Sequence, residues 1–244
     1  PAKLALFDGS YIDVHIAVSQ VDKFDQENYM LEVRDISEHR RAVMALHDIN
    51  LDLEQRVKDR THELSQEIKI RKQAEKKLRQ MATHDNLTGL PNRSLLMDRI
   101  ENAIAGAERN KGRAALMFID LDGFKAVNDT LGHEAGDILL KDVAKCLLSS
   151  VRKTDTVARI GGDEFIILLS SVPDEEMALA VAKEVLKALA KHFEINGDIA
   201  NIGGSIGMSF YPNHGEFADQ LLKEADNAMY DVKKRGKNSI AIAP

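Results

Sequence analysis

Residues 38–82 contain neither glycine nor proline, and this constrains the fold more than any other feature of the sequence. Glycine and proline are the residues that most often end or break a helix, so their absence over such a length predicts one long helix. Apolar residues recur along this stretch near heptad spacing: Leu46, Leu53, Val57, Leu64, Ile68, Leu78 and Met81. The helix therefore divides the chain into a short segment before it and a longer one after it.

The predicted helix needs a surface against which to bury its apolar residues, and a second copy of the same helix can supply one. Asn50, Arg60 and Arg71 interrupt the apolar positions, which predicts an imperfect, parallel two-stranded coiled coil. The alternative is a solvated spacer helix without a partner. We assign residues 37–82 to a coiled-coil signalling helix and expect a homodimer, paired through this helix and the domain that follows it.

The segment before the helix is predicted to form strands. From residue 11 to 18, apolar and other residues alternate with the period of a half-buried strand, and residues 28–36 predict a second strand. Two or three strands cannot form a stable domain alone. The sequence RDISEHRRA, with Asp35, Ile36 and Ser37, resembles the exit of PAS sensor domains. We expect residues 1–36 to be the C-terminal part of a PAS-like domain.

Composition limits the partners and the compartment. The formal net charge is −6, so no overall positive field attracts nucleic acid, and we expect no nucleic-acid partner. The single cysteine, Cys146, cannot form an internal disulfide, which fits a reducing, cytoplasmic compartment. No run of about 18 apolar residues occurs, so we expect no membrane contact in this segment. The chain begins with Pro1 rather than methionine, and we expect a fragment of a longer protein.

From residue 83 onward, helical and strand patterns alternate. We expect helices over 93–110, 135–152, 173–193 and 217–232. We expect strands over 113–122, 156–160, 165–171 and 238–243, and a strand or hairpin over 199–212. This order predicts a mixed sheet with helices packed on it.

Carboxylates stand where two of these apolar strands end. The glycine pair Gly161-Gly162 can make a tight turn, so ARIGGDEFIILL predicts a hairpin with Asp163 and Glu164 at its tip. Asp120 and Asp122 end another apolar strand and point to one face of it. If that strand lies beside the hairpin, the acids converge into an oxygen site suited to Mg²⁺ or Mn²⁺. The alternative is a solvated turn.

Residues 161–165, GGDEF, together with their surroundings, resemble the GGDEF family of diguanylate cyclases. The similar segments are DNLTGLPNR, FIDLDGFKAVNDTLGHEAGD, SIG at 205–207 and ADNAMYDVKKRGKN, in the family's order over about residues 83–244. The resemblance implies an α+β fold with a central mixed, mainly antiparallel five-stranded sheet flanked by helices, like the palm of nucleotidyl cyclases and polymerases. It also implies condensation of two GTP into cyclic di-GMP with release of two pyrophosphates.

The resemblance assigns roles to the acidic residues. Asp120, Asp163 and the carbonyl of Leu121 match the family's metal ligands. Glu164 matches the residue that helps bind metal and takes the proton from the attacking 3′-hydroxyl, as a carboxylate beside a metal ion can do. For Asp122 we instead expect a cap of the following turn.

The resemblance also implies a GTP site. The backbone amides of Gly123 and Phe124 can cradle phosphates, and Lys125 adds charge. Asn128 and Asp137 match the residues that read guanine, although a turn asparagine and a helix N-terminal aspartate are the alternatives.

His133 has a counterpart near the base, or is a structural turn residue. Lys233 and Lys237 match the basic pair that meets the β- and γ-phosphates, with lysine at 237 replacing the more usual arginine. Their alternative role is to complement the helix dipole.

Arg152 and Asp155 match an RxxD inhibitory site, in which cyclic di-GMP binds as a feedback ligand. An arginine fork suits phosphate and guanine edges, and the aspartate suits guanine N–H donors. The alternative is an ion pair at a helix end.

Residues 83–244 are therefore expected to be a Mg-dependent, dimeric, product-inhibited diguanylate cyclase domain. One alternative is a catalytically silent GGDEF module that acts as a receptor for GTP or cyclic di-GMP. Another is a coiled-coil dimerisation fragment, which leaves the nucleotide segment unexplained.

Overall fold

The long apolar strand that ends in Asp120 and Asp122 forms the centre of the main sheet. In the computed structural model, which describes residues 1–23 and 26–244, this strand is β4 (Arg113–Asp122). The sheet order is β10-β9-β4-β6-β5, with β5 (Thr156–Gly161), β6 (Glu164–Val172), β9 (Gly203–Tyr211) and β10 (Ser239–Ile242). Among the described strands of this sheet, only β9 and β10 pair in parallel. The predicted mixed, mainly antiparallel five-stranded sheet is confirmed.

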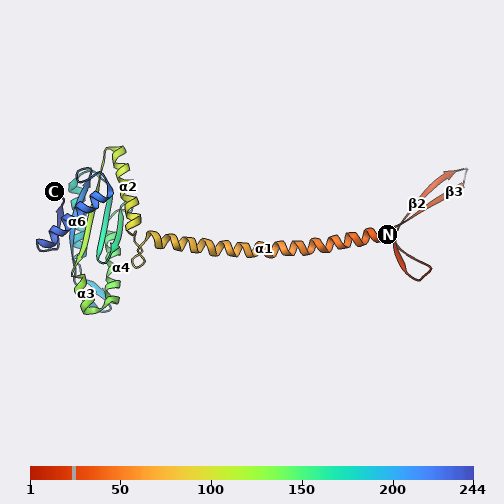
Figure 1. Cartoon of the computed structure of the whole chain (residues 1–244), viewed down its shortest axis with the longest axis horizontal. Helices are drawn as coiled ribbons and strands as arrows, with labels where there is room; N and C mark the ends of the chain where they lie inside the picture. Colours follow the sequence, from red (N-terminus) through yellow and green to blue (C-terminus); the bar gives the residue numbers. More distant parts are fainter. Residues whose placement is uncertain (24–25) are drawn as a thin grey trace. The chain divides into compact units, whose positions relative to one another are not determined.

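Helices cover both faces of this sheet (Figure 1). On one face α2 (Arg93–Asn110) and α6 (Ala218–Lys234) pack on the even-numbered residues of β4, such as Leu116 and Phe118. On the other face α4 (His133–Ser149) and α5 (Glu175–Leu189) pack on the odd-numbered residues, such as Met117 and Ile119. The acids that end β4 at even positions therefore belong to the α2 and α6 face.

One glycine sets how closely α6 approaches the sheet. A Cβ atom at Gly207 of β9 would lie 2.0 Å from the Ala225 carbonyl oxygen and 2.2 Å from the Met229 nitrogen. Both atoms belong to the backbone of α6, so only glycine allows this contact. The close contact fixes the distance of α6 from the sheet. It thereby also positions Lys233, which lies in the last turn of α6.

Several predicted elements differ in extent or type. The segment that includes the predicted GTP-binding residues Phe124, Lys125 and Asn128 forms a helix that was not expected, α3 (Phe124–Leu131), which ends at Gly132 with φ 87°. The helix predicted over 135–152 begins earlier and ends at Ser149, where the hydroxyls of Ser149 and Ser150 bond to the Cys146 carbonyl. Residues 199–200 belong to an unpredicted hairpin, β7 (Phe193–Ile195) and β8 (Asp198–Ala200), rather than to β9. The helix predicted over 93–110 is confirmed.

The chain forms two compact units, residues 1–74 and residues 75–244. The first contains an antiparallel sheet, β1 (Ala2–Ala5), β2 (Tyr11–Lys23) and β3 (Gln26–Asp35), in the order β1-β2-β3. The alternation in β2 predicts a half-buried strand, but of its four alternating apolar residues only Val14 is fully buried, whereas Ile16 and Val18 are exposed. A single-layer sheet of this size has little against which to bury them.

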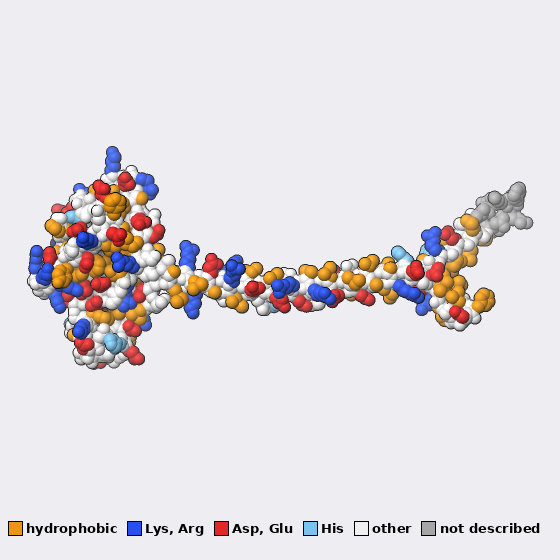
Figure 2. Space-filling view, viewed as in Figure 1, with side chains coloured by type: hydrophobic (Ala, Val, Ile, Leu, Met, Phe, Trp, Pro, Cys, Tyr) orange, Lys and Arg blue, Asp and Glu red, His pale blue; other side chains and the backbone are white. Residues whose placement is uncertain are grey.

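The predicted long helix is confirmed as α1 (Ser37–Thr83). It begins where the Asp35 carboxylate accepts a hydrogen bond from the Ser37 amide at 2.8 Å. No residue of α1 is buried, and Figure 2 shows apolar side chains recurring along its surface. The apolar positions of the predicted coiled coil are among those exposed residues. None of the helices in the described residues combines the length and apolar character needed to cross a membrane.

Candidate active site at the carboxyl end of the central strand

Strand register brings two of the predicted acids together. Asp120 of β4 lies directly opposite Glu164 of β6 on one side and Ser205 of β9 on the other. Directly opposed residues of an antiparallel pair project to the same face. Asp120 is only 7% exposed, whereas Glu164 is half-buried. The two carboxyl groups thus share the α2 and α6 face.

The predicted hairpin is also present, and its turn is bonded to β4. Strand β5 ends at Gly161 and β6 begins at Glu164, so the turn consists of Gly162 and Asp163. Gly162 has φ 50°, a left-handed conformation that glycine adopts at no steric cost. The Leu121 amide donates a hydrogen bond of 3.2 Å to the Asp163 carbonyl. Asp163 and Glu164 are therefore held at the same edge as Asp120.

The acids of this edge disfavour one another's charge. Burial raises the pKa of Asp120, and the nearby Asp163 and Asp122 raise it further, against the opposing effect of Lys233. Burial likewise raises the pKa of Glu164, with further contributions from Asp120, Asp226 and Asp163. Clusters of carboxyl groups with raised pKa values are typical of sites that bind cations or transfer protons.

Lys233 supplies a positive charge to this cluster. Its Nζ lies 2.6 Å from Asp120 Oδ2, an ion pair between the last turn of α6 and the end of β4. Burial opposes the charge of Lys233, but the hydrogen bond and charge of Asp120 raise its pKa on balance. The predicted phosphate ligand therefore contacts a predicted metal ligand.

The donor set fits a hard divalent cation, although it is not arranged around one. Asp120, Asp163 and Glu164 offer carboxylate oxygens at one edge, the donors that Mg²⁺ and Mn²⁺ prefer. Within residues 1–23 and 26–244, no group of three or more His, Cys, Asp or Glu side chains is poised to hold a metal ion. With Lys233 against Asp120, the lysine provides the charge that a cation would provide. The metal roles of Asp120, Leu121, Asp163 and Glu164 stay predictions.

The prediction for Asp122 is wrong. Its carboxylate accepts hydrogen bonds from the Ser205 hydroxyl, at 2.9 and 3.1 Å, and from the Asn238 amide at 3.0 Å. No side chain caps α3 at Gly123. Asp122 instead joins β4 to β9 and to the loop before β10, because both of those donors lie beside the end of β4. It thereby fixes the strand end that carries Asp120.

The predicted guanine-reading residues lie on neighbouring helices. Asn128 belongs to α3, so the alternative of a turn asparagine is wrong, and Asp137 lies near the start of α4. A Cβ atom at Gly136 would lie 1.9 Å from Asn128 Oδ1, so the amide of Asn128 packs against the backbone next to Asp137. Gly136 was not predicted to belong to this site, and its one signal in the sequence is a glycine inside a helical pattern.

The remaining predicted nucleotide residues lie in the segments that follow β4 and α6 in the chain. Gly123, with φ 91°, starts α3, and Phe124 packs partly against the core, while Lys125 and His133 are exposed. Lys237 follows α6, has φ 63° and is exposed. Their contacts with GTP stay predictions.

Arg152 and Asp155 lie apart from this edge, and the expected helix end is wrong. Arg152 follows α4 in the loop before β5. The Arg152 amide donates to Asp155 Oδ2 at 3.1 Å, and the guanidinium contacts Met177 Sδ at 3.9 Å. Both residues line a pocket of about 310 Å³ together with Leu169, Met177 and Val181. This geometry is that of a cavity rather than of an ion pair at a helix end.

Two further residues were missed: Arg159, which contacts the hairpin turn, and Asp85, which binds Arg159. Asp85 and Arg159 form an ion pair, and Arg159 bonds to the Gly162 carbonyl. The sequence gives little sign of this, because the partners lie 74 positions apart.

Comparison with known proteins agrees with this geometry. The family described as "Diguanylate cyclase, GGDEF domain" matches residues 82–239. The bifunctional diguanylate cyclase/cyclic di-GMP phosphodiesterase MucR of Pseudomonas aeruginosa is 43% identical over 197 residues, which are 81% of this chain and 28% of MucR. Diguanylate cyclase TpbB of the same species is 36% identical over 167 residues, 68% of this chain and 38% of TpbB. The chain thus spans well under half of these relatives.

Solved structures show the same fold. The GGDEF domain of TpbB from P. aeruginosa matches with a TM-score of 0.65 and 36% identity, over 66% of this chain and 94% of that one. The coiled coil and GGDEF domain of DgcB from Caulobacter crescentus, in complex with c-di-GMP, matches with a TM-score of 0.66 and 28% identity, over 78% and 99%. The family match covers more than half of the chain and includes the edge that carries Asp120, Asp163 and Glu164. The chain therefore belongs to the GGDEF domain family of diguanylate cyclases.

Proposed function

We propose that this chain condenses two GTP molecules into cyclic di-GMP and releases two pyrophosphates. The observation that carries the proposal is the register of the central strands, which puts Asp120 opposite Glu164 with Asp163 in the adjoining turn. MucR and TpbB, which are named as diguanylate cyclases, support it.

In this proposal the carboxylates divide the work. Asp120, Asp163, Glu164 and the Leu121 carbonyl would hold Mg²⁺ or Mn²⁺. The bound ion would lower the pKa of the attacking 3′-hydroxyl and offset charge on the phosphate. Glu164 accepts the proton of that hydroxyl, for which its half-buried position and raised pKa suit it.

The nucleotide is held by residues around the end of β4. The amides of Gly123 and Phe124 bind phosphate oxygens, and Lys233 and Lys237 meet the β- and γ-phosphates. Lys233 and a metal ion would compete for the Asp120 carboxylate, because both are cations. A metal ion bound to Asp120 would therefore free Lys233 to contact the phosphates.

Guanine recognition falls to the two neighbouring helices. Asn128 and Asp137 accept from the guanine N–H groups, with His133 near the base. Adenine lacks this pair of donors and would leave the Asp137 carboxylate without partners, so GTP is selected over ATP.

We propose that the active form is a dimer. Each domain holds one GTP, so two domains must face each other for the reaction. The exposed apolar positions of α1 suit a coiled coil with a second copy, which would pair the domains. The DgcB structure, described as a coiled coil and GGDEF domain, supports this arrangement. The small sheet β1–β3 and the exit through Asp35 and Ser37 fit the proposed PAS-like segment.

We further propose that cyclic di-GMP inhibits the enzyme by binding at Arg152 and Asp155. The pocket of about 310 Å³ beside them offers a guanidinium, a carboxylate and an apolar wall formed by Leu169 and Val181. Arg152→Ala should weaken inhibition by added cyclic di-GMP in progress curves, with the initial rate little changed. Equal inhibition of variant and wild type would refute the site.

The experiment that tests the main proposal is incubation of the purified chain with GTP and Mg²⁺, followed by chromatographic detection of cyclic di-GMP and pyrophosphate. ATP in place of GTP, and EDTA in place of Mg²⁺, are the controls, and neither should give product. The second candidate is a silent receptor, favoured by the contact of Lys233 with Asp120. Binding of GTP or cyclic di-GMP without turnover would establish the receptor and overturn the enzyme.

A further inference from the structure

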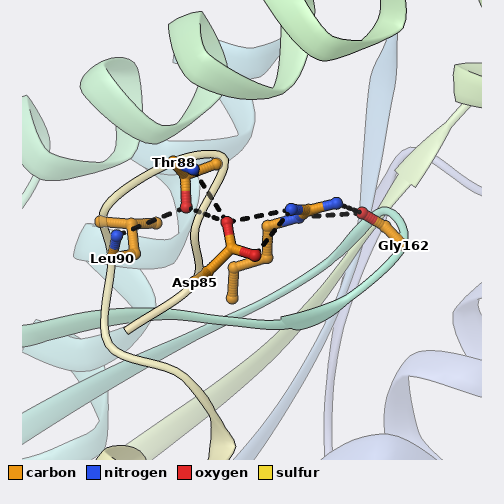
Figure 3. A network of polar contacts seen from close by, with 5 residues as sticks. Asp85, Thr88, Leu90 and Gly162 are labelled. Carbon is orange, nitrogen blue, oxygen red and sulfur yellow. Dashed lines mark hydrogen bonds and ion pairs between the residues drawn. The ribbon is translucent and has the colours of Figure 1, made fainter. Parts of the chain in front are cut away.

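A half-buried arginine connects the catalytic hairpin to the segment that follows α1 (Figure 3). Arg159 of β5 places Nη1 3.0 Å from both carboxylate oxygens of Asp85. Its Nε and Nη2 donate to the Gly162 carbonyl at 3.0 and 2.7 Å. The side chain of Arg159 is 10% exposed and that of Asp85 is 22% exposed, so the ion pair between them is largely shielded from solvent, whereas Gly162 lies at the exposed tip of the hairpin.

Asp85 is itself held in place by its own turn. Asp85 Oδ1 accepts hydrogen bonds from the Thr88 amide at 2.9 Å and from the Thr88 hydroxyl at 2.6 Å. Burial opposes the charge on Asp85, but the hydrogen bonds of Thr88 and the guanidinium of Arg159 lower its pKa on balance. The carboxylate is therefore a fixed anchor for Arg159, rather than a mobile surface partner.

The two bonds to Gly162 act on the turn that carries Asp163. The Gly162 carbonyl is held by Arg159, and the Asp163 carbonyl is held by the Leu121 amide of β4. Strand β5 has a register shift between Arg159 and Gly161, an irregularity of the kind that re-aims side chains beside active sites. The peptide planes on either side of Asp163 are thus fixed from two different elements.

The same arginine is tied to the residues that join α1 to α2. The Arg159 amide donates to the Pro91 carbonyl at 3.0 Å. Asn92 binds the end of α1 twice, through its side chain to the Ala82 carbonyl and through its amide to the Thr83 carbonyl. A continuous series of hydrogen bonds therefore runs from the last turn of α1 to the catalytic turn.

We infer that Arg159 is a positioning residue, anchored by Asp85, that holds the Gly162–Asp163 turn in the geometry that binds the divalent cation. The inference rests on the proposed metal role of Asp163 and Glu164. Without the Arg159 guanidinium, which bonds to both Asp85 and Gly162, the turn samples other orientations. Only the competent fraction of molecules, those whose turn has the binding geometry, then binds the cation. The apparent dissociation constant for the cation therefore rises by the inverse of that fraction. A competent fraction of about one tenth raises it about tenfold.

The test measures cation binding directly. Arg159→Lys keeps the charge but cannot bond to Asp85 and Gly162 with a planar fork, and Asp85→Asn removes the anchor. Mn²⁺ binding, followed by the EPR signal of the free ion, should weaken by about tenfold in both variants. The Mg²⁺ concentration for half-maximal turnover should rise by a similar factor, with a smaller change in the KM for GTP. The double variant should be little worse than the single ones, because both act through one contact.

Two matched controls make the same kinds of substitution at residues that do not contact the hairpin turn. Arg99→Lys makes the same change at an arginine that bonds to Thr156, at the other end of β5. Asp142→Asn makes the same change in the exposed ion pair with Lys145. Both should bind Mn²⁺ like the wild type.

The outcomes are distinct. Wild-type Mn²⁺ affinity in folded Arg159→Lys and Asp85→Asn would overturn the inference, as would a wild type that binds no Mn²⁺. Loss of folded structure in both variants, seen by thermal melting, would show a purely structural role and overturn it too. A wild type that binds Mn²⁺ but forms no cyclic di-GMP would refute the proposed function, while the binding comparison would still decide the inference.

Discussion

Replacing Gly207 by alanine should destabilise residues 75–244. Among the glycines of this unit whose φ lies outside the left-handed region, Gly207 should be the one at which alanine costs the most stability. The new Cβ would stand 2.0 Å from the Ala225 carbonyl oxygen, where ordinary contact begins near 3.4 Å, so α6 must withdraw by about 1.4 Å (3.4 − 2.0). The Cβ position is fixed by the backbone of β9, and the atoms that it would meet belong to the backbone of α6, so no side-chain rotation can relieve the contact.

The expected cost follows from this displacement. Overpacking of a well-packed core costs about 1–3 kcal/mol, and the backbone clash puts Gly207→Ala at about 3 kcal/mol. The lower entropy of unfolded alanine offsets about 0.4–1 kcal/mol. The net loss of about 2–3 kcal/mol corresponds to a fall in Tm of roughly 5–10 °C for a unit of this size. Because α6 carries Lys233, its ion pair with Asp120 should also weaken.

The assay is thermal unfolding followed by circular dichroism, with Gly106→Ala as the matched control. Gly106 lies within α2, and a Cβ atom there would meet nothing within 4 Å. That variant should be stabilised by about 0.5–1 kcal/mol, since alanine favours a helix over glycine. If Gly207→Ala melts at or above the wild-type temperature, the reasoning about the contact between β9 and α6 is refuted.

Three further predictions concern nucleotide, pH and pairing. Gly136→Ala should push the Asn128 amide aside and raise the KM for GTP about tenfold with kcat little changed; an unchanged KM would contradict it. Glu164 has a raised pKa and must be deprotonated to accept a proton, so kcat/KM should fall as pH falls through that pKa. A higher Mg²⁺ concentration should shift this fall in kcat/KM to lower pH, and the absence of a shift would argue against contact between Glu164 and the metal ion. Lysine at both Leu53 and Leu64 should lower activity per molecule, with partial recovery at high protein concentration; activity independent of concentration would exclude pairing through α1.

Sequence patterns predicted the elements whose ends depend on residues that are close together in the sequence. The helix over 93–110 is confirmed because its ends carry their own signals: Asn92 accepts from the Leu95 amide, and Lys111 adopts φ 50°. The hairpin around Gly161 and Gly162 is confirmed for the same kind of reason, since the turn needs residues that tolerate positive φ.

Contacts between distant residues were not predictable in this way. Nothing near Asp122 in the sequence indicates Ser205 or Asn238 as its partners, and these partners replaced the expected turn cap. The contact of Lys233 with Asp120 depends on the close approach of α6 to β9 at Gly207. The helical form of α3 was missed because this segment was interpreted only through its predicted contacts with GTP, whereas its residues Phe124–Leu131 include a buried Val127 that packs on the core.

The central claim is that the carboxylate edge of β4 and the hairpin joins GTP molecules, and Glu164→Gln tests it most directly. The amide keeps the size of the side chain and one acceptor oxygen, so the variant should fold like the wild type. It cannot accept the proton of the 3′-hydroxyl or balance the charge of a metal ion. Purified wild type with GTP and Mg²⁺ should yield cyclic di-GMP, and Glu164→Gln should yield none. Formation of cyclic di-GMP by the variant at a rate near that of the wild type would contradict the account.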